Sequence, residues 1–287
     1  MRYLTLLIAL LFTTSSLAAE LIRHPRPAGE RDLRNIYTLD VLRLALDKTL
    51  ESDGPYRLES IAEIMPQSRA IRELGDGRQL DVLWTMTTRE REQQLRPIRI
   101  PIQKGLIGYR LLIIRHEDQA WFRNVERIEQ LRELRAGQGH DWPDTDILLA
   151  NGIGVEQTSG YDNLFSMLQQ GRFDFLPRGL NEAWDEVGQR DEMGLSVDRH
   201  LLLHYPAAVY FFVNRDNNEL AERIERGLTR ALDDGSFDKL FFNHPVNRAA
   251  LVEARLTERR IFRLNNPLLP EETPLQDARL WFTPDPN

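Results

Sequence analysis

The residues best placed to do chemistry in this sequence are two threonines and an arginine that follow a short apolar segment. Residues 80–84 have the length and composition of a buried strand, and Thr87 and Thr88 come soon after it. Thr87 could cap a helix while Glu90 reaches back to the Thr87 N–H, which is the reciprocal arrangement of a capping box. The free amides of that helix start and the guanidinium of Arg91 would together suit a carboxylate. The pattern predicts an anion-binding turn at the carboxyl end of a strand; the alternative is a solvated surface arginine.

Two other patterns could support a different chemistry. His140 and Glu182 could supply a base and an acid at one cleft, although Glu182 also suits the first turn of a helix. His200 and His204 have the spacing of a metal site on a helix, but the leucines between them indicate a strand, on which they would lie ~13 Å apart. We therefore expect no metal. Residues 152–154, Gly-Ile-Gly, lack the third glycine of a dinucleotide loop, so we expect no cofactor.

The elements that would position these residues alternate between strand and helix. Apolar residues recur at helical spacing between residues 34 and 50, and a second helix opens near Pro66 and ends at Gly75. Strands are predicted before, between and after them, at residues 21–23, 56–61, 80–84 and 107–114. This order is typical of an α/β fold with mostly parallel sheets flanked by helices.

A second unit of the same kind is predicted after residue 114. Its helices are expected at residues 121–134, from Pro143 to residue 151, and at 161–170, with strands at 173–176 and 201–203. The break at Tyr205 and Pro206 marks the return to the first unit, and the remaining tail is mostly helical. We therefore predict two lobes, one formed by residues 20–114 and 205–287 and the other by residues 115–204.

The N-terminus has the features of a cleaved targeting segment. Arg2 supplies a positive charge, residues 4–12 are apolar, and residues 16–19 are small or apolar residues suited to a signal peptidase. The apolar run is much shorter than the ~20 residues of a membrane-spanning helix. The chain has no cysteine, so neither a lipid-modified cysteine nor a disulfide is expected. We predict that residues 1–19 are removed and that the mature protein resides in a bacterial periplasm.

Charge and length limit the classes of partner. The formal net charge of −7 becomes −8 when Arg2 is removed with residues 1–19, and 268 of the 287 residues remain. That balance argues against a nucleic acid or an anionic membrane surface as partner, because both need a basic face. The length suits two lobes of ordinary size. We expect a monomer that binds a small molecule.

The chain resembles the bacterial extracellular solute-binding proteins of family 3, the periplasmic receptors of polar amino-acid uptake systems. The resemblance rests on the leader and on residues 81–91, 137–139 and 171–174. It implies a clamp of two hinged lobes that closes on a small solute. It also implies that Arg91 grips a ligand carboxylate beside Thr87 and Thr88.

Further ligand contacts follow from the same resemblance. The turn at Gly139 and His140 matches a ligand-contacting turn of the family, whereas Arg178 lies near the place of the acidic partner of the ligand amine. A cation there would repel an α-ammonium group, so we expect a ligand with negative or neutral polar groups. Arg26 could add another cation to the cleft.

Four aromatic residues could stack against a ligand. Trp84, Tyr109, Trp142 and Trp184 fall near predicted strand ends or helix starts, although each also suits the core or the rim. The sequence thus predicts a periplasmic binding protein for a small polar, anionic solute. Two alternatives use the same clamp: a dehydratase-like enzyme, and a receptor that signals to a membrane sensor instead of serving an ABC permease.

Overall fold

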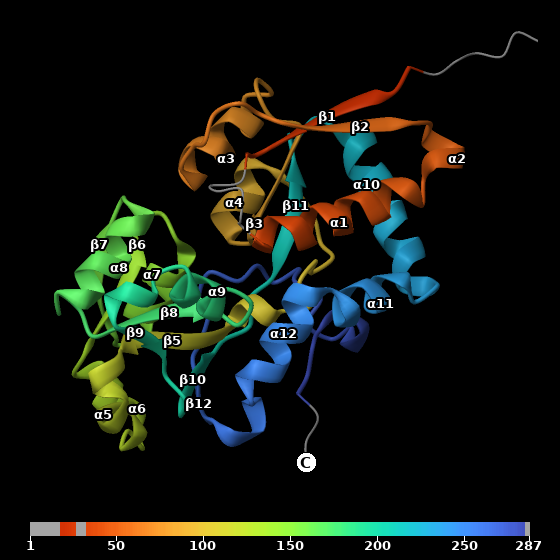
Figure 1. Cartoon of the computed structure of the whole chain (residues 1–287). Coiled ribbons are helices and arrows are strands. Elements are labelled where there is room, and N and C mark those ends of the chain that lie inside the picture. The colour runs from red at the N-terminus through yellow and green to blue at the C-terminus, as the bar shows by residue number, and fades with distance from the viewer. Residues whose placement is uncertain (1–17, 27–32, 285–287) are drawn as a thin grey trace, which may run out of the picture.

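The computed structural model describes residues 18–26 and 33–284, which form two α/β lobes (Figure 1). The chain crosses between the lobes before residue 109, before residue 209 and before residue 260. The fold class predicted from the sequence is confirmed. Residues 1–17 of the predicted targeting segment lie outside the described residues. Among the helices that are described, none is long and apolar enough to span a membrane.

The first lobe is built around two small sheets. Its elements are β1 (Glu20–His24), α1 (Leu33–Asp47), α2 (Leu50–Asp53), β2 (Tyr56–Ser60), α3 (Gln67–Gly75), β3 (Val82–Met86), α4 (Arg89–Gln94), β4 (Arg96–Ile98), β11 (Val209–Val213), α10 (Asn218–Asp233) and α11 (Ser236–Asn243). β1 pairs with β2, and β11 lies between β3 and β4. Leu220, Ile224 and Leu228 of α10 recur every fourth residue, so they share one helix face and enter the first-lobe core with α1.

The second lobe contains a seven-stranded sheet in the order β12-β10-β5-β8-β6-β7, with β9 also paired to β5. Its elements are β5 (Tyr109–Arg115), α5 (Gln119–Arg123), α6 (Ile128–Arg132), β6 (Arg135–Gly139), α7 (Pro143–Ala150), β7 (Gly154–Thr158), α8 (Tyr161–Gln169), β8 (Phe175–Gly179), α9 (Ala183–Gly188), β9 (Leu195–Val197), β10 (Leu201–His204) and β12 (Arg260–Arg263). The helix α12 (Pro245–Ala254) contacts α1 and α11 of the first lobe, and its Ala250 and Ala254 pack on the second-lobe core. Single 3₁₀ turns occupy Leu106–Gly108, His116–Asp118, Asp191–Met193, Leu256–Glu258 and Ala278–Leu280.

Two strands account for every antiparallel pairing among the described residues. β5 runs antiparallel to β8, β9 and β10, and β11 runs antiparallel to β3 and β4. The other pairs, such as β6 with β7, are parallel. β5 and β11 are the strands that the chain enters after its first two crossings between the lobes. β12, which it enters after a third crossing, pairs in parallel with β10.

Several lobe and helix boundaries in the structure differ from those expected from the sequence. β5 lies in the middle of the larger sheet, so the chain has already entered the second lobe by Tyr109, not after residue 114. β12, which falls in the segment 205–287 assigned to the first lobe, is an edge strand of the same larger sheet. The helix expected at residues 121–134 is divided into α5 and α6.

The segments that precede β5 and β11 connect the two lobes, and they touch each other. We call this contact region the hinge. The backbone N–H of Tyr205 donates to the carbonyl of Gly108 at 3.2 Å. A Cβ atom on Gly108 would lie only 2.1 Å from the carbonyl oxygen of Tyr205. No other residue type fits that approach without a shift of backbone, so Gly108 sets the distance between the two crossings.

This contact predicts the effect of a methyl group at the hinge. Gly108→Ala should lower the free energy of unfolding by about 1–3 kcal/mol, because the added Cβ forces two backbone segments apart. Gly188→Ala is the matched control, since nothing lies within 4 Å of a Cβ built there, and its stability should be unchanged or slightly higher. Urea unfolding followed by circular dichroism measures both. Equal stability of the two variants would contradict the contact.

Candidate functional site

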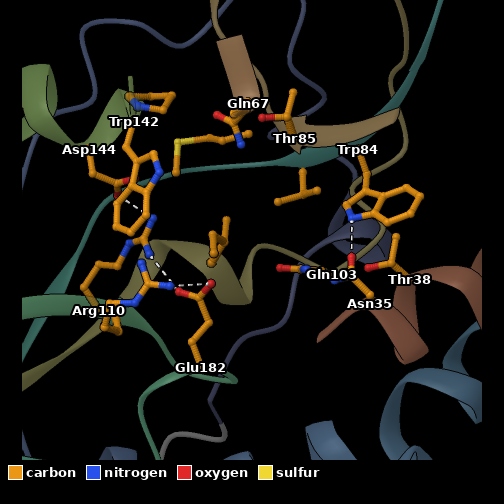
Figure 2. Close-up of a pocket in the computed structure, with 15 residues that line it drawn as sticks. Asn35, Thr38, Gln67, Trp84, Thr85, Gln103, Arg110, Trp142, Asp144 and Glu182 are labelled. Carbon is orange, nitrogen blue, oxygen red and sulfur yellow. Dashed lines mark hydrogen bonds and ion pairs between the residues drawn. The ribbon is translucent and has the colours of Figure 1, made fainter. Parts of the chain in front are cut away.

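A polar pocket of about 250 Å³ lies between the lobes. The first lobe contributes side chains from α1, β3 and the start of α3, and the second contributes side chains from β5, β8 and the start of α7. Figure 2 shows Trp142 and Trp84 on opposite sides of this space. The polar and aromatic lining residues are Asn35, Thr38, Gln67, Trp84, Thr85, Gln103, Arg110, Trp142, Asp144, Arg178 and Glu182.

The wall from the first lobe carries mostly uncharged polar groups. Asn35 and Thr38 lie one helical turn apart on α1, which brings them to the same face. The Nε1–H of Trp84 donates to Asn35 Oδ1 at 3.1 Å, and the Trp84 ring meets Phe211 edge-on. These contacts hold the indole at the edge of the pocket.

The N-cap of the helix after β3 lies one residue later in the chain than the sequence predicted. Thr88 is the N-cap of α4, and its Oγ1 accepts from the N–H of Arg91 at 3.1 Å. Thr87 instead donates its hydroxyl to Glu92 Oε1 at 2.6 Å, while Glu90 accepts from Gln94 in the next turn. The prediction of a Thr87–Glu90 box is therefore wrong. The reason is that α4 begins at Arg89, so Thr88 is the residue at the N-cap, while the N–H of Thr87 already donates to the Ala208 carbonyl at 2.8 Å.

Arg91 is buried and held by protein acceptors. Its Nη1 donates to Thr85 Oγ1 at 2.6 Å and to the Met86 carbonyl at 2.9 Å. Its Nη2 donates to Gln67 Oε1 at 2.6 Å and to the Asp141 carbonyl of the second lobe at 3.2 Å. Burial lowers its pKa to about 10, so the guanidinium stays charged at neutral pH. Arg91 borders an adjoining hollow and is not among the residues that line the pocket itself.

The wall from the second lobe is an ion-pair network centred on Arg110. Arg110 is 2% exposed; its Nη2 pairs with Asp144, and its Nη1 lies 3.5 Å from Glu182 Oε2. Its Nε donates to the hydroxyl of Tyr205 at 2.8 Å, and that hydroxyl in turn donates to Asp144. Burial acts to lower the pKa of Arg110, but the neighbouring carboxylates outweigh it and raise the pKa. Figure 2 shows the pairs of Arg110 with Asp144 and Glu182 at the pocket.

Arg178 continues the same network. Its Nε and Nη2 donate to the two carboxylate oxygens of Glu186 at 2.7 and 2.6 Å, and Nη2 lies 3.1 Å from Glu182 Oε1. The guanidinium also lies 4.6 Å from the centre of the Trp142 ring. Burial acts to lower the pKa of Arg178, but both glutamates raise it above its usual value. Arg178 lines the pocket as expected, yet two carboxylates balance its charge, which removes the argument that it repels an α-ammonium group.

The residues proposed from the sequence divide into three groups. Four of them line the pocket: Trp84, Trp142, Arg178 and Glu182. Three others, Thr88, Arg91 and His140, border the adjoining hollow, which Trp142 borders as well. The other five line neither space: Arg26, Thr87, Tyr109, Gly139 and Trp184.

Two members of this last group have clear structural positions. Arg26 is exposed and donates to the carbonyl of Ala62 at 2.8 Å. Gly139 lies under the indole of Trp142, where a Cβ would come within 2.6 Å of the ring. His140 and Glu182 border different spaces, so the structure does not bring the two residues of the proposed acid–base pair to one site.

Sequence reasoning missed most of the polar lining. Arg110 carried a detectable signal, since a lone charge before the apolar run 111–114 has no place in a buried strand unless it is paired. Asp144 follows Pro143 in the first turn of the helix that was predicted there. Asn35, Thr38 and Gln103 carried no such signal. In the part of the chain that the structure describes, no cluster of His, Asp and Glu could hold a metal ion.

Tyr109 lies at a separate hollow behind the hinge. Its ring lies against His204, with the ring centres 4.4 Å apart, and the two residues are register partners on β5 and β10. Burial, aided by the charge of Arg263, lowers the pKa of His204 to about 4. The folded protein therefore disfavours the protonated form of this imidazole.

The buried network predicts a large effect of removing one charge. Arg178→Met should lower the free energy of unfolding by about 3–5 kcal/mol, because Glu182 and Glu186 then lose their buried partner. Adding Glu186→Gln to that variant should recover part of the loss. Arg172→Met is the control, since Arg172 is exposed, and should change stability by less than about 0.5 kcal/mol. Similar unfolding curves for the two single variants would refute the pairing.

His204 predicts a dependence of stability on pH. Because its pKa is lower in the folded state than the ordinary value of 6.5, its contribution to stability is complete above pH 6.5 and is lost as pH falls toward 4. The stability difference between the parent and His204→Gln should therefore shrink by about 2–3 kcal/mol over that range. Urea unfolding at pH 7, 5.5 and 4 measures it. A difference that does not vary with pH would show that His204 titrates normally.

Comparisons with known proteins agree with this architecture. No family profile and no curated protein sequence matches the chain. A Salmonella typhimurium periplasmic binding protein with high arginine specificity is 14% identical, with a TM-score of 0.58 over 77% of this chain and 97% of that one. A histidine kinase sensor domain similar to periplasmic binding proteins is 17% identical, with a TM-score of 0.55 over 78% and 95% of the two chains.

A third match is an ancestral amino acid-binding protein that is a precursor of cyclohexadienyl dehydratase. It is 12% identical, with a TM-score of 0.54 over 77% of this chain and 93% of that one. The identities are low, and what the three structures share with this chain is the arrangement of the elements. The chain has the two-lobed α/β fold of the periplasmic binding proteins.

Proposed function

We propose that this protein is a periplasmic solute-binding protein that captures a small polar solute between its lobes. The observation that carries the proposal is the pocket of about 250 Å³ with polar walls from both lobes. Its volume is close to the lower end of the usual range for ligand pockets, ~300 Å³, which suits a molecule of amino-acid or monosaccharide size. A ligand that touches both walls would favour the closed arrangement of the lobes.

Contacts around Asp141 support a clamp that closes over its ligand. The Asp141 carboxylate accepts from the N–H of Ser68, in the first turn of α3, at 3.1 Å. The Asp141 carbonyl accepts from Arg91, also of the first lobe. Residues of the two lobes thus meet beside the pocket, and they would limit the escape of a bound solute.

The proposal also covers what the protein does after it has captured the solute. We infer delivery to an inner-membrane ABC permease or signalling to a membrane sensor, and both roles use the same closing motion. Similar folds occur in a sensor domain and in a dehydratase precursor. No contact in the described residues favours catalysis here, because His140 and Glu182 border different spaces. A binding role therefore has the stronger support.

Ligand binding is tested by a thermal-shift screen of the mature protein against amino acids, dicarboxylates, sugars and sugar acids. A ligand at 100 times its Kd should raise the free energy of unfolding by about 2.7 kcal/mol. Trp142→Ala should weaken binding of any ligand found by tenfold or more, because the indole forms one side of the pocket. Trp121→Ala is the matched control, since Trp121 is exposed on α5, away from the pocket.

Two outcomes would count against the proposal. One is a screen without any ligand, and the other is a ligand whose affinity depends equally on Trp121 and Trp142. Conversion of a bound compound into a product would favour the enzyme.

A further inference from the structure

We propose that the cleft selects an uncharged solute rich in hydroxyl or amide groups, in preference to an amino acid or an anion. This inference rests on the proposed solute-binding function and specifies its substrate class. Three observations carry it: the paired charges of one wall, the engaged guanidinium of Arg91, and an unpartnered buried amide on the other wall.

The charges that line the pocket are paired with one another, and the buried Glu186 behind them gives the network one more carboxylate than guanidinium. Arg110 and Arg178 supply two positive charges, and Asp144 and Glu182 supply two negative ones. Each guanidinium lies within 3.5 Å of a lining carboxylate, and Glu186 further engages Arg178. A ligand carboxylate would have to displace a protein carboxylate from a buried arginine, and a ligand cation would have to displace the arginine. An uncharged ligand leaves the network intact, so it avoids the cost of an unpaired buried charge.

The four Nη–H donors of Arg91 are already engaged by protein acceptors, which leaves none of them for a ligand carboxylate. Both of its Nη atoms donate to protein acceptors, four in all, and one of these is the carbonyl of Asp141 in the opposite lobe. Binding an α-carboxylate would break contacts that hold the lobes together. The structure thus assigns Arg91 to lobe contact, whereas the resemblance to the solute-binding family implied a grip on the ligand.

The opposite wall presents a hydrogen-bond acceptor without a partner. Gln103 is 8% exposed, lines the pocket, and its Oε1 accepts no hydrogen bond in the structure. Figure 2 places Gln103 beside Asn35, across the space from Arg110 and Asp144. An amide oxygen that is buried without a partner is unfavourable, so a hydroxyl or amide N–H of a ligand would bind there with a net gain. Trp84 and Trp142 add apolar faces for the ring or chain that carries such groups.

The substrate class is tested with compounds that share a skeleton and differ in charge. Calorimetry would compare glucose with glucosamine and glucuronate, and succinamide with succinamate and succinate, alongside glutamine and a wider set of neutral sugars, polyols and amides. We expect a neutral compound to bind at least tenfold more tightly than its charged analogues and than glutamine.

The possible results separate this inference from the proposed function. A charged compound or an amino acid that binds more tightly than every neutral one would overturn the inference and leave the solute-binding function intact. The same holds if charged compounds bind and no neutral compound does. If no compound of either kind binds, both fail.

A pair of variants tests the role of Gln103. Gln103→Met removes the acceptor at similar volume and should weaken the neutral ligand roughly tenfold. Gln138→Met is the matched control, because Gln138 is also buried with an unpartnered Oε1 but does not line the pocket. Equal affinity of the two variants would overturn the assignment of Gln103.

A charge-introducing variant covers the case in which Gln103→Met folds poorly. Gln103→Glu keeps an acceptor at this position and adds a negative charge to a balanced pocket. It should therefore shift the preference from glucose toward glucosamine by tenfold or more, a change of selectivity that a purely structural role of Gln103 would not produce. An unchanged ratio of the two affinities would contradict the inference.

Discussion

The pairing of buried arginines with carboxylates in the second lobe is the constraint on which the cleft depends. Arg110 comes from β5, Arg178 from β8 and Asp144 from α7, so the network ties two neighbouring strands of the sheet to a helix that packs beside it. Each charge is buried, and a buried ion that loses its partner costs several kcal/mol. The positions of β5, β8 and α7 are thereby fixed relative to one another, and with them the wall of the pocket.

The same network reaches the hinge. Tyr205 lies on the segment that returns from β10 to β11, and its hydroxyl joins Arg110 to Asp144. The backbone of Tyr205 touches Gly108 on the other crossing segment. A ligand that contacts Arg110 or Asp144 therefore contacts groups bonded directly to the hinge. This gives a physical route by which occupancy of the pocket and the angle between the lobes can influence each other.

What the sequence could predict followed from local patterns. The apolar residues of α1 and α3 recur at helical spacing, and both helices form where expected. The residues Val82–Met86 form a strand because they are buried on both faces, which the apolar composition indicated. The position of the N-cap before Arg91 was harder to predict, because Thr87 and Thr88 both offer a hydroxyl group. Only the backbone geometry of the folded chain selects Thr88.

Other features depend on contacts that no local pattern encodes. β12 is a short segment with an arginine at each end, and it forms a strand because β10 offers a parallel edge. Arg178 lines the pocket, but the effect of its charge was misjudged because its chief partner, Glu186, lies eight residues farther along the chain. The sequence lists the charged residues, but only the folded structure shows which of them form ion pairs.

Arg91 lies beside the cleft, but its hydrogen bonds go to protein acceptors and not to the ligand that the sequence predicted there. The helix start that follows β3 holds its guanidinium next to the cleft, as the sequence predicted. There it binds Thr85, whose side chain lines the pocket, and Asp141, which belongs to the other lobe. Because the Nη atoms of this guanidinium donate to acceptors of both lobes, they hold the lobes together without a solute. In the proposed function, the solute would therefore have to supply less of the free energy that holds the lobes together.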